Sequence, residues 1–134
     1  MDRIPVSTVL LTKNSAASLR TYFASMEEID DIILLDGGST DDTLTLAAEH
    51  PNCRVFPQDK RFIDEQGYII DFSGMRNSGY ALAKHKWILC VDADEEANPA
   101  LLAEVREIVA KNEPAVYFAQ RIFFYHGKPV VNFA

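Results

Sequence analysis

The acidic run from Asp92 to Glu96 has the clearest chemical potential in the chain, with four carboxylates in five positions. Mg²⁺ and Mn²⁺ prefer oxygen ligands and commonly keep waters and substrate phosphates in their coordination shell. The alternative is a polar loop whose negative charge complements the dipole of a following helix. Four crowded like charges favour a cation, so the pattern predicts a divalent metal at Asp92 and Asp94.

A second candidate site is the glycine-containing stretch from Asp36 to Asp42. Its glycines permit a tight turn and the close approach of a ligand. Asp36 follows an apolar run and could accept hydrogen bonds from a base or a sugar. Ser39 and Asp42 have the spacing of a capping box, so we assign residues 39–42 mainly to capping the next helix. Only Asp36 of this stretch is assigned to a ligand.

Basic and amide side chains supply the remaining candidates. Arg76 and Asn77 fall in the first turns of an expected helix, where a guanidinium could pair with a diphosphate. The alternative for Arg76 is an ordinary solvated surface arginine. Thr12, Lys13 and Asn14 directly follow an apolar, β-branched run.

These residues require strands and helices in alternation to bring them together. Apolar runs at 6–12, 32–35, 54–56 and 87–91 predict buried strands. Helical spacing predicts one helix over 15–26 and a second from Asp42 to about His50. A third helix is predicted, with Phe72, Met75, Gly79 and Leu82 on its inward face. Asn98 and Pro99 predict the start of a last helix, which Asn112 and Pro114 end.

This order predicts an α/β fold with a mainly parallel, Rossmann-like sheet, helices on both faces and a C-terminal β-hairpin around residues 115–131. In such sheets ligands bind beyond the carboxyl ends of the strands. The candidates follow the first, second and fourth predicted strands, so we expect them to converge on one crevice.

Length, charge and hydrophobic pattern argue against several classes of protein. The chain has 134 residues, enough for one domain, and 13 Lys plus Arg against 20 Asp plus Glu give a net charge of −7. That balance argues against nucleic-acid binding. Residues 1–5 do not resemble a signal peptide, no apolar run spans a bilayer, and Cys53 and Cys90 are read as buried thiols. We therefore expect a cytoplasmic protein.

Four segments together resemble glycosyltransferase family 2, whose inverting enzymes have the GT-A fold. The segments are 6–14, 32–43, 75–79 and 87–95, and they occur in the family's order and spacing. The match covers residues 6 to about 125 and is closest to the N-terminal, nucleotide-sugar-binding half. Thr12-Lys13-Asn14 and Asp92-Ala93-Asp94 look most like bacterial enzymes of lipopolysaccharide-core and surface-glycan assembly.

The resemblance implies that one set of side chains binds the nucleotide part of a sugar donor: Thr12, Lys13, Asn14, Asp36, Arg76, Asn77 and Asp92. Within this set, Asp36 and the turn 12–14 would contact the nucleobase. Asp92 would approach the ribose and the metal. Asp94, in the family's DXD motif, would ligate the Mn²⁺ or Mg²⁺ that binds the donor diphosphate.

Two positions depart from the family pattern, since many members have an aromatic residue at Lys13 and an acid at Gly37. The family's acceptor region and general base lie beyond the fourth motif, outside these 134 residues. We therefore expect residues 1–134 to form a nucleotide-sugar-binding domain truncated before the acceptor-binding part. No catalytic base is assigned, and we expect donor binding with little or no transfer.

The resemblance implies inverting transfer from a nucleotide sugar, UDP-linked by preference, to a glycan or lipid-linked acceptor in cell-envelope glycan biosynthesis. Peripheral membrane association of the full-length enzyme and a homodimer are further expectations. One alternative is a non-catalytic nucleotide-sugar-binding or regulatory module. Another is a sugar-phosphate nucleotidyltransferase, but such enzymes begin with a glycine- and arginine-rich phosphate loop that residues 12–15 do not resemble.

Overall fold

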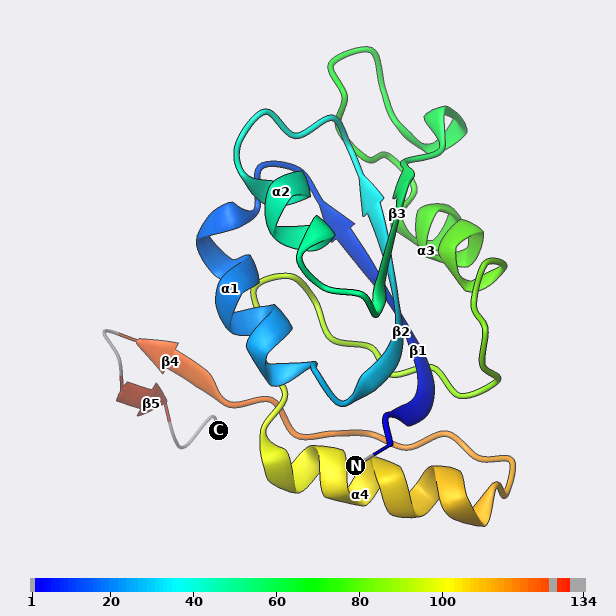
Figure 1. Ribbon diagram of the computed structural model, residues 1–134. Coiled ribbons are helices and arrows are strands. Elements are labelled where there is room, and N and C mark those ends of the chain that lie inside the picture. Colours follow the sequence, from blue (N-terminus) through cyan, green and yellow to red (C-terminus); the bar gives the residue numbers. More distant parts are fainter. Residues whose placement is uncertain (1, 126–127, 131–134) are drawn as a thin grey trace.

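Three parallel strands form the centre of the molecule in the computed structural model, which describes residues 2–125 and 128–130 (Figure 1). They are β1 (Ile4–Thr12), β2 (Ile29–Asp36) and β3 (Cys53–Pro57), and β2 lies between the other two. β1 and β2 are buried along almost their whole length. This continuous burial is why their sequences are apolar runs and do not alternate with polar residues.

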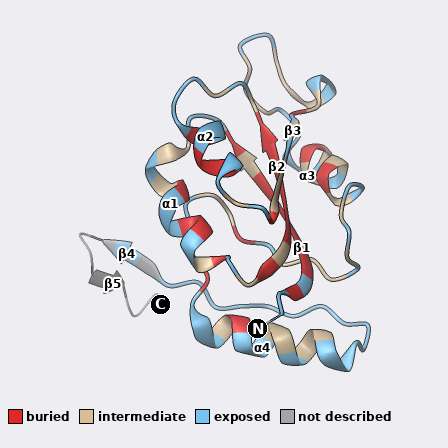
Figure 2. Cartoon of the chain, in the orientation of Figure 1, coloured by how far each residue is buried: buried red, intermediate tan, exposed pale blue. Residues whose placement is uncertain are grey.

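Successive side chains of β2 face opposite layers of helices. Ile32 and Leu34 belong to the larger core, which also contains residues of α1 (Ala16–Ser25), α2 (Thr43–Ala48) and α4 (Pro99–Lys111). Ile33 and Leu35 belong to a smaller core with Met75 of α3 (Phe72–Tyr80). Buried segments therefore line both faces of the sheet (Figure 2). The predicted α/β sheet with helices on both faces is confirmed.

The expected fourth strand is only partly formed. Residues 87–91 run beside β1, but the ladder consists of one parallel bridge between Ser7 and Ile88. Ser7 N donates to Trp87 O at 2.9 Å, and Leu89 N donates to Ser7 O at 3.0 Å. The segment thus occupies the edge of β1 opposite β2 without being a regular strand. It still carries the chain to Asp92 at the carboxyl edge of the sheet.

Two helix ends match their sequence signals. Asn98 Oδ1 accepts a hydrogen bond from Leu101 N at 2.8 Å, and Pro99 is the first residue of α4. Asn112 ends α4 in the left-handed conformation, with φ of 51°. An asparagine tolerates this conformation better than most residues, so both caps were readable from sequence.

Other local expectations were wrong. The capping box at Ser39 and Asp42 is absent, because α2 begins at Thr43 and Asp42 makes no side-chain cap. The carboxylate of Asp41 instead accepts from Thr43 N and from Ala16 N, the first residues of α2 and α1. Leu82 lies beyond the end of α3 and is exposed, and so is Phe72 at its start. Cys90 is also exposed.

Short elements complete the chain. The 3₁₀ helix η1 (Lys60–Phe62) lies between β3 and α3. β4 (Phe123–Tyr125) pairs antiparallel with β5 (Lys128–Val130) in a separate two-stranded sheet. The turn residues His126 and Gly127 of the expected hairpin, and Val131, lie outside the described residues. Of the described helices, none is long and apolar enough to cross a membrane.

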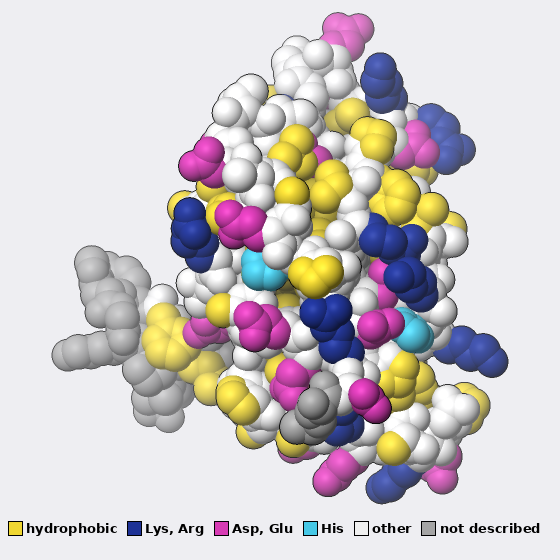
Figure 3. Space-filling model, viewed as in Figure 1, with side chains coloured by type: hydrophobic (Ala, Val, Ile, Leu, Met, Phe, Trp, Pro, Cys, Tyr) yellow, Lys and Arg dark blue, Asp and Glu magenta, His cyan; other side chains and the backbone are white. Residues whose placement is uncertain are grey.

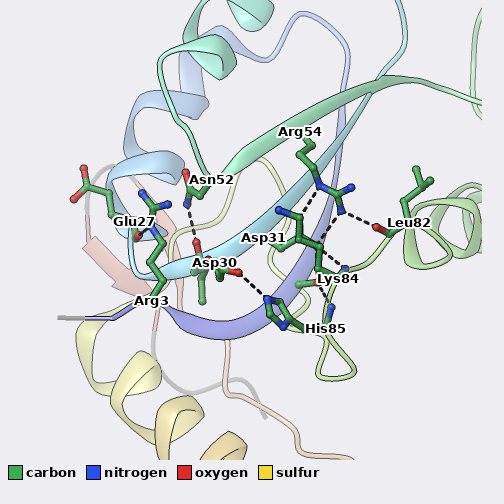
Figure 4. Close-up of polar contacts among 11 residues, drawn as sticks. Arg3, Glu27, Asp30, Asp31, Asn52, Arg54, Leu82, Lys84 and His85 are labelled. Atoms are coloured by element: carbon green, nitrogen blue, oxygen red, sulfur yellow. Dashed lines mark hydrogen bonds and ion pairs between the residues drawn. The ribbon is translucent and has the colours of Figure 1, made fainter.

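A buried polar network fixes the amino-terminal side of the sheet (Figure 4). Asp31 is fully buried, and its carboxylate accepts from Arg54 Nε at 2.9 Å and from Ser7 Oγ at 2.7 Å. The same carboxylate accepts from Lys84 N at 2.9 Å, and Ser7 Oγ accepts from His85 N at 3.1 Å. These bonds attach the loop after α3 to the sheet and so determine where the segment 87–94 begins.

Candidate active site

A cavity of about 350 Å³ lies just beyond the carboxyl end of β1. It is bounded by the β1–α1 turn, the first turns of α3 and the loop that follows the 87–91 segment. The lining residues are Leu11, Asn14, Ser15, Ala17, Ser18, Phe72, Arg76, Asp92, Ala93 and Asp94. Of the residues expected to converge on one crevice, Asn14, Asp92 and Asp94 line this cavity, and Arg76 of α3 lines it as well.

The carboxylates at the cavity have different partners. Asp92 Oδ1 accepts from Arg76 Nη2 at 3.2 Å, and both side chains are partly exposed. Asp94 is exposed and makes no hydrogen bond or ion pair within the described part of the chain. Asp94 therefore offers its oxygen atoms to a ligand, whereas Asp92 shares one of its oxygens with Arg76.

Ion pairs with arginines relieve part of the charge crowding in the acidic run. Glu95 turns back so that Oε1 accepts from Asp92 N at 2.9 Å, and Glu95 Oε2 pairs with Arg121 Nε at 2.9 Å. Two of the acids therefore have arginine partners, because Arg76 also pairs with Asp92. Among the described residues, no group of three or more His, Cys, Asp or Glu side chains is arranged to hold a metal.

The side chains of Arg76 and Asn77, although adjacent in sequence, point in different directions. The guanidinium carbon of Arg76 lies 5.8 Å from the centroid of the Phe72 ring and faces the cavity. Asn77 is exposed and does not line the cavity. Neighbouring helical residues point about 100° apart, so only one of the two can face this space.

The β1–α1 turn is shaped by cross-links to the loop after β2. Asn14 has φ of 51°, and its Oδ1 accepts from Thr40 N at 2.7 Å. Asn14 N donates to Ser39 Oγ at 2.8 Å. Lys13 points away from the cavity, with Nζ 6.0 Å from the centroid of the Tyr68 ring. Asn14 therefore holds two loops together, and Lys13 lies nearer the loop that precedes α3.

Asp36 lies at the end of β2, as expected, but its oxygen atoms are already engaged. Oδ1 accepts from Thr12 Oγ1 at 2.8 Å and from Ser39 Oγ at 2.6 Å, and Oδ2 accepts from Gly38 N at 2.9 Å and Ser39 N at 2.8 Å. Burial alone would raise the pKa of Asp36, but these hydrogen bonds outweigh it and hold the pKa below its ordinary value. Asp36 and Thr12 thus shape the loop.

Gln58 is a residue at this edge that the sequence interpretation missed. No role was assigned to it from the sequence, and only 7% of it is exposed. Its Nε2 donates to Thr12 O and to Leu35 O, each at 3.1 Å, which ties the ends of β1 and β2. The available signal was its position directly after Pro57, the last residue of β3.

The sequence was compared with models of protein families. Residues 7–131 match the model of glycosyl transferase family 2. The chain belongs to this family. The segments that carried the resemblance in the sequence all fall inside the matched region, apart from Val6 at the start of the first segment.

Individual relatives of this family 2 domain are longer proteins. An uncharacterized glycosyltransferase of Rickettsia felis is 33% identical over 118 residues, which cover 87% of this chain and 38% of that protein. LpsC of Rhizobium meliloti, a lipopolysaccharide core biosynthesis glycosyltransferase, is 25% identical over 116 residues, or 41% of its length. The chain therefore spans about two fifths of these relatives.

A solved structure shares the fold of the family 2 domain. The crystal structure of residues 1–349 of S. aureus TarS, in complex with UDP, superimposes with a TM-score of 0.61 at 20% sequence identity. The match covers 83% of this chain and 32% of the TarS chain. This likeness supports the GT-A assignment.

Proposed function

We propose that this family 2 domain binds a UDP-sugar through a divalent cation and provides the donor side of an inverting glycosyl transfer. The observation that carries the proposal is the cavity that Arg76 and Asp94 both line, in which the Asp94 carboxylate has no partner among the described residues. A cation and a guanidinium on the same side of the sheet form a suitable environment for a diphosphate. The UDP bound to TarS supports the choice of nucleotide.

The residues at the cavity fit Mn²⁺ or Mg²⁺ in one mode of coordination only. Asp94 and Asp92 supply too few ligands for a cation held by protein alone, in agreement with the absence of a larger acidic group among the described residues. They fit an ion that takes its other ligands from water and a diphosphate. When bound, the cation would neutralise the charge that develops on the leaving diphosphate.

The protein's own groups would bind and orient the donor. Asp94 would hold the cation side of the diphosphate, and Arg76 would donate hydrogen bonds to phosphate oxygens after releasing Asp92. Asn14 keeps the β1–α1 turn in the left-handed conformation that forms one wall of the cavity. Asn77 and Lys13 lie outside the lining, so we propose no diphosphate contact for either residue.

Two alternatives from the sequence can be weighed against these observations. Membership of family 2 leaves the nucleotidyltransferase alternative without support. A non-catalytic module that binds a nucleotide sugar uses the same cavity and differs only in lacking transfer. The name of LpsC supports a glycan or lipid-linked acceptor in cell-envelope glycan synthesis. Cytoplasmic location, peripheral membrane association and a homodimer stay predictions.

The test is thermal unfolding of the chain with UDP in the presence of Mn²⁺, and in EDTA. UDP at about 100 times its dissociation constant should stabilise the fold by ~2.7 kcal/mol when Mn²⁺ is present. Mn²⁺ alone is the control for non-specific ion binding. Equal stabilisation by UDP in EDTA would contradict the metal-dependent part of the proposal, and no stabilisation in either buffer would contradict donor binding.

A further inference from the structure

Gln58 carries chemistry that the proposed diphosphate site does not use. Its side chain extends from the end of β3 across β2, because its Nε2 reaches Thr12 O of β1 and Leu35 O of β2. Its own backbone N donates to Asp36 O at 3.0 Å. The carboxamide therefore lies beneath the loop that joins β2 to α2, at the carboxyl edge of the sheet.

The orientation of this carboxamide is fixed by its partners. Both hydrogens of Nε2 are directed at backbone carbonyl oxygens, which can only accept hydrogen bonds. A flipped amide would place Oε1 against the same two oxygens and lose both bonds. Oε1 is consequently held on the opposite side of the amide, with its orientation determined by the sheet.

Oε1 of Gln58 is a free acceptor that remains reachable. It has no hydrogen-bond partner among the described residues. The side-chain atoms in the described chain that are both fully enclosed and unpartnered are Thr8 Oγ1 and Tyr22 Oη, so Gln58 Oε1 is not sealed off. A residue that is 93% buried thus presents one oriented oxygen that has no partner in the described chain and is not completely enclosed.

Gly37 leaves the space next to this oxygen open. A Cβ atom at position 37 would lie 2.8 Å from Gln58 Oε1 and 3.2 Å from its Cδ. Any larger residue would displace the carboxamide or cover its oxygen. Gly37 N meanwhile donates to Thr12 O at 2.9 Å, which holds the glycine over the amide. Gly37 and Gln58 therefore form a coupled pair.

The pair lies where the base of a bound nucleotide would fall. The cavity with Asp94 lies at the outer edge of β1, whereas Gln58 and Gly37 lie over the ends of β1 and β2. At ~4.8 Å per strand, these two places are about 10 Å apart or less along the same edge. An extended nucleoside diphosphate can span this distance with its phosphates at Asp94.

We propose that Gln58 Oε1 accepts a hydrogen bond from the imide N3–H of uracil and thereby selects uridine over cytidine nucleotides. The proposal rests on the proposed function and deepens it by naming a residue that determines base specificity. Asp36 is less suited to this contact, because protein donors already engage both of its oxygens. Cytosine presents an unprotonated ring nitrogen at the position of N3–H, and two acceptors facing each other repel.

The main experiment measures the dissociation constants of UDP and CDP by calorimetry with Mn²⁺ present. The parent chain should bind UDP roughly tenfold more tightly than CDP, as expected from one buried hydrogen bond. Gln58→Met keeps the length of the side chain without the carboxamide and should bring the UDP-to-CDP ratio close to one. Gln66→Met, at an exposed glutamine of the loop before α3, is the matched control and should leave the ratio unchanged.

The ratio separates base recognition from a structural effect, since a weakened fold would lower both affinities alike. N3-methyl-UDP tests the same bond from the ligand side and needs no variant, and it should bind the parent at least tenfold more weakly than UDP. Gly37→Ala, which crowds the carboxamide, should also lower the ratio. A parent chain that binds UDP and CDP equally, or a ratio unchanged in Gln58→Met, overturns the assignment of Gln58 while leaving donor binding standing. Failure of the parent to bind UDP at all overturns the proposed function itself.

Discussion

The carboxylates at the carboxyl edge of the sheet differ in how far their oxygen atoms are already engaged. Asp36 accepts four hydrogen bonds from within the chain, and Asp92 is paired with Arg76. Asp94 lines the cavity without a partner in the described chain. A carboxylate with free oxygens is the natural cation ligand, whereas one that is fully hydrogen-bonded is a structural group. This difference separates residues that look equivalent in sequence.

Replacing Asp94 with Asn should weaken Mn²⁺-dependent binding of UDP by at least tenfold, or ~1.4 kcal/mol, because an amide is a poorer ligand for a hard cation. The free energy of unfolding without ligand should change little, since Asp94 makes no contact within the described fold. Calorimetric titration of UDP with Mn²⁺ checks the first expectation and urea unfolding the second. Asp42→Asn, at an exposed acid that makes no cap, is the control. Equal UDP affinity in the two variants would remove Asp94 from the metal site.

At the scale of elements, the loop between α3 and the 87–91 segment determines where Asp92 and Asp94 fall. Asp31 holds that loop through Lys84 N, and Arg54 Nη2 donates to Leu82 O at 2.6 Å. His85 Nε2 lies 2.7 Å from Asp30 Oδ2 on the outside of the same loop (Figure 4). The position of the site at one end of the sheet thus depends on polar contacts at the other end.

Replacing Asp31 with Asn should destabilise the fold by about 2–3 kcal/mol, because it leaves Arg54 without its buried counter-ion. This loss is smaller than the ~3–5 kcal/mol usual for a fully buried pair, since the Arg54 side chain is 31% exposed. Asp30→Asn is the matched control, and its partly exposed pair with His85 should contribute less than ~1 kcal/mol. Urea unfolding at pH 7 measures both. If the two variants lost equal stability, the buried network would have no special role.

The same network predicts how stability depends on pH. Burial alone would raise the pKa of Asp31, but the hydrogen bonds from Arg54, Ser7 and Lys84 hold it below its ordinary value of 3.8, as hydrogen bonds also do for Asp36. Because both pKa values are lower in the folded state, the ionised carboxylates stabilise the fold fully above the unfolded value. That contribution is lost as the pH falls through 3.8 and then through the folded pKa values.

Urea midpoints measured between pH 7 and pH 2.5 should therefore fall most steeply below pH 4. The fall should be shallower in Asp31→Asn, which no longer has one of the carboxylates whose pKa is lowered in the fold. Asp30→Asn is again the control and should keep the steep dependence of the parent. A parallel fall in Asp31→Asn and in the parent would show that acid unfolding is governed by other carboxylates.

At the scale of the whole molecule, the surface combines interspersed charges with an apolar region. Lysine, arginine and acidic side chains are mixed on the face viewed in Figure 3, and apolar side chains lie beside the segment that leads into β4. The exposed large apolar residues of that region are Val116, Tyr117, Phe118, Ile122 and Phe124. Phe118 is 96% exposed. Several exposed apolar side chains on one segment favour association with another surface.

We therefore expect the chain to self-associate in solution, with a sedimentation coefficient that rises with protein concentration. Phe118→Asp should shift the equilibrium toward the monomer by at least tenfold, because burying an uncompensated charge in a contact is costly. Leu44→Asp, on α2 at a distance from this region, tests whether any added charge has the same effect. A parent chain that is monomeric at all concentrations, or equal effects of the two substitutions, would remove the 116–124 region as an association surface.

Local sequence patterns determined most of the framework. The apolar runs of β1 and β2, the caps at Asn98 and Asn112 and the acids after the 87–91 segment were readable because each depends on neighbours a few residues away. The rule that ligands bind at the carboxyl ends of parallel strands then predicted that Asp92 and Asp94 lie at the same edge of the sheet as Asn14. Family membership followed from these motifs and was confirmed by the family model.

Tertiary structure alone decided which polar groups are available for chemistry. Gln58 reaches Thr12 across 46 positions, Asp31 meets Arg54 across 23, and Arg121 meets Glu95 only when the end of the chain passes the site. No local period encodes such pairs, because they depend on the register of the sheet and on where each loop crosses it. The sequence could therefore supply the candidate carboxylates. Only the packed sheet distinguishes the hydrogen-bonded oxygens of Asp36 from the side-chain oxygens of Asp94 and Gln58, which have no partner in the described chain.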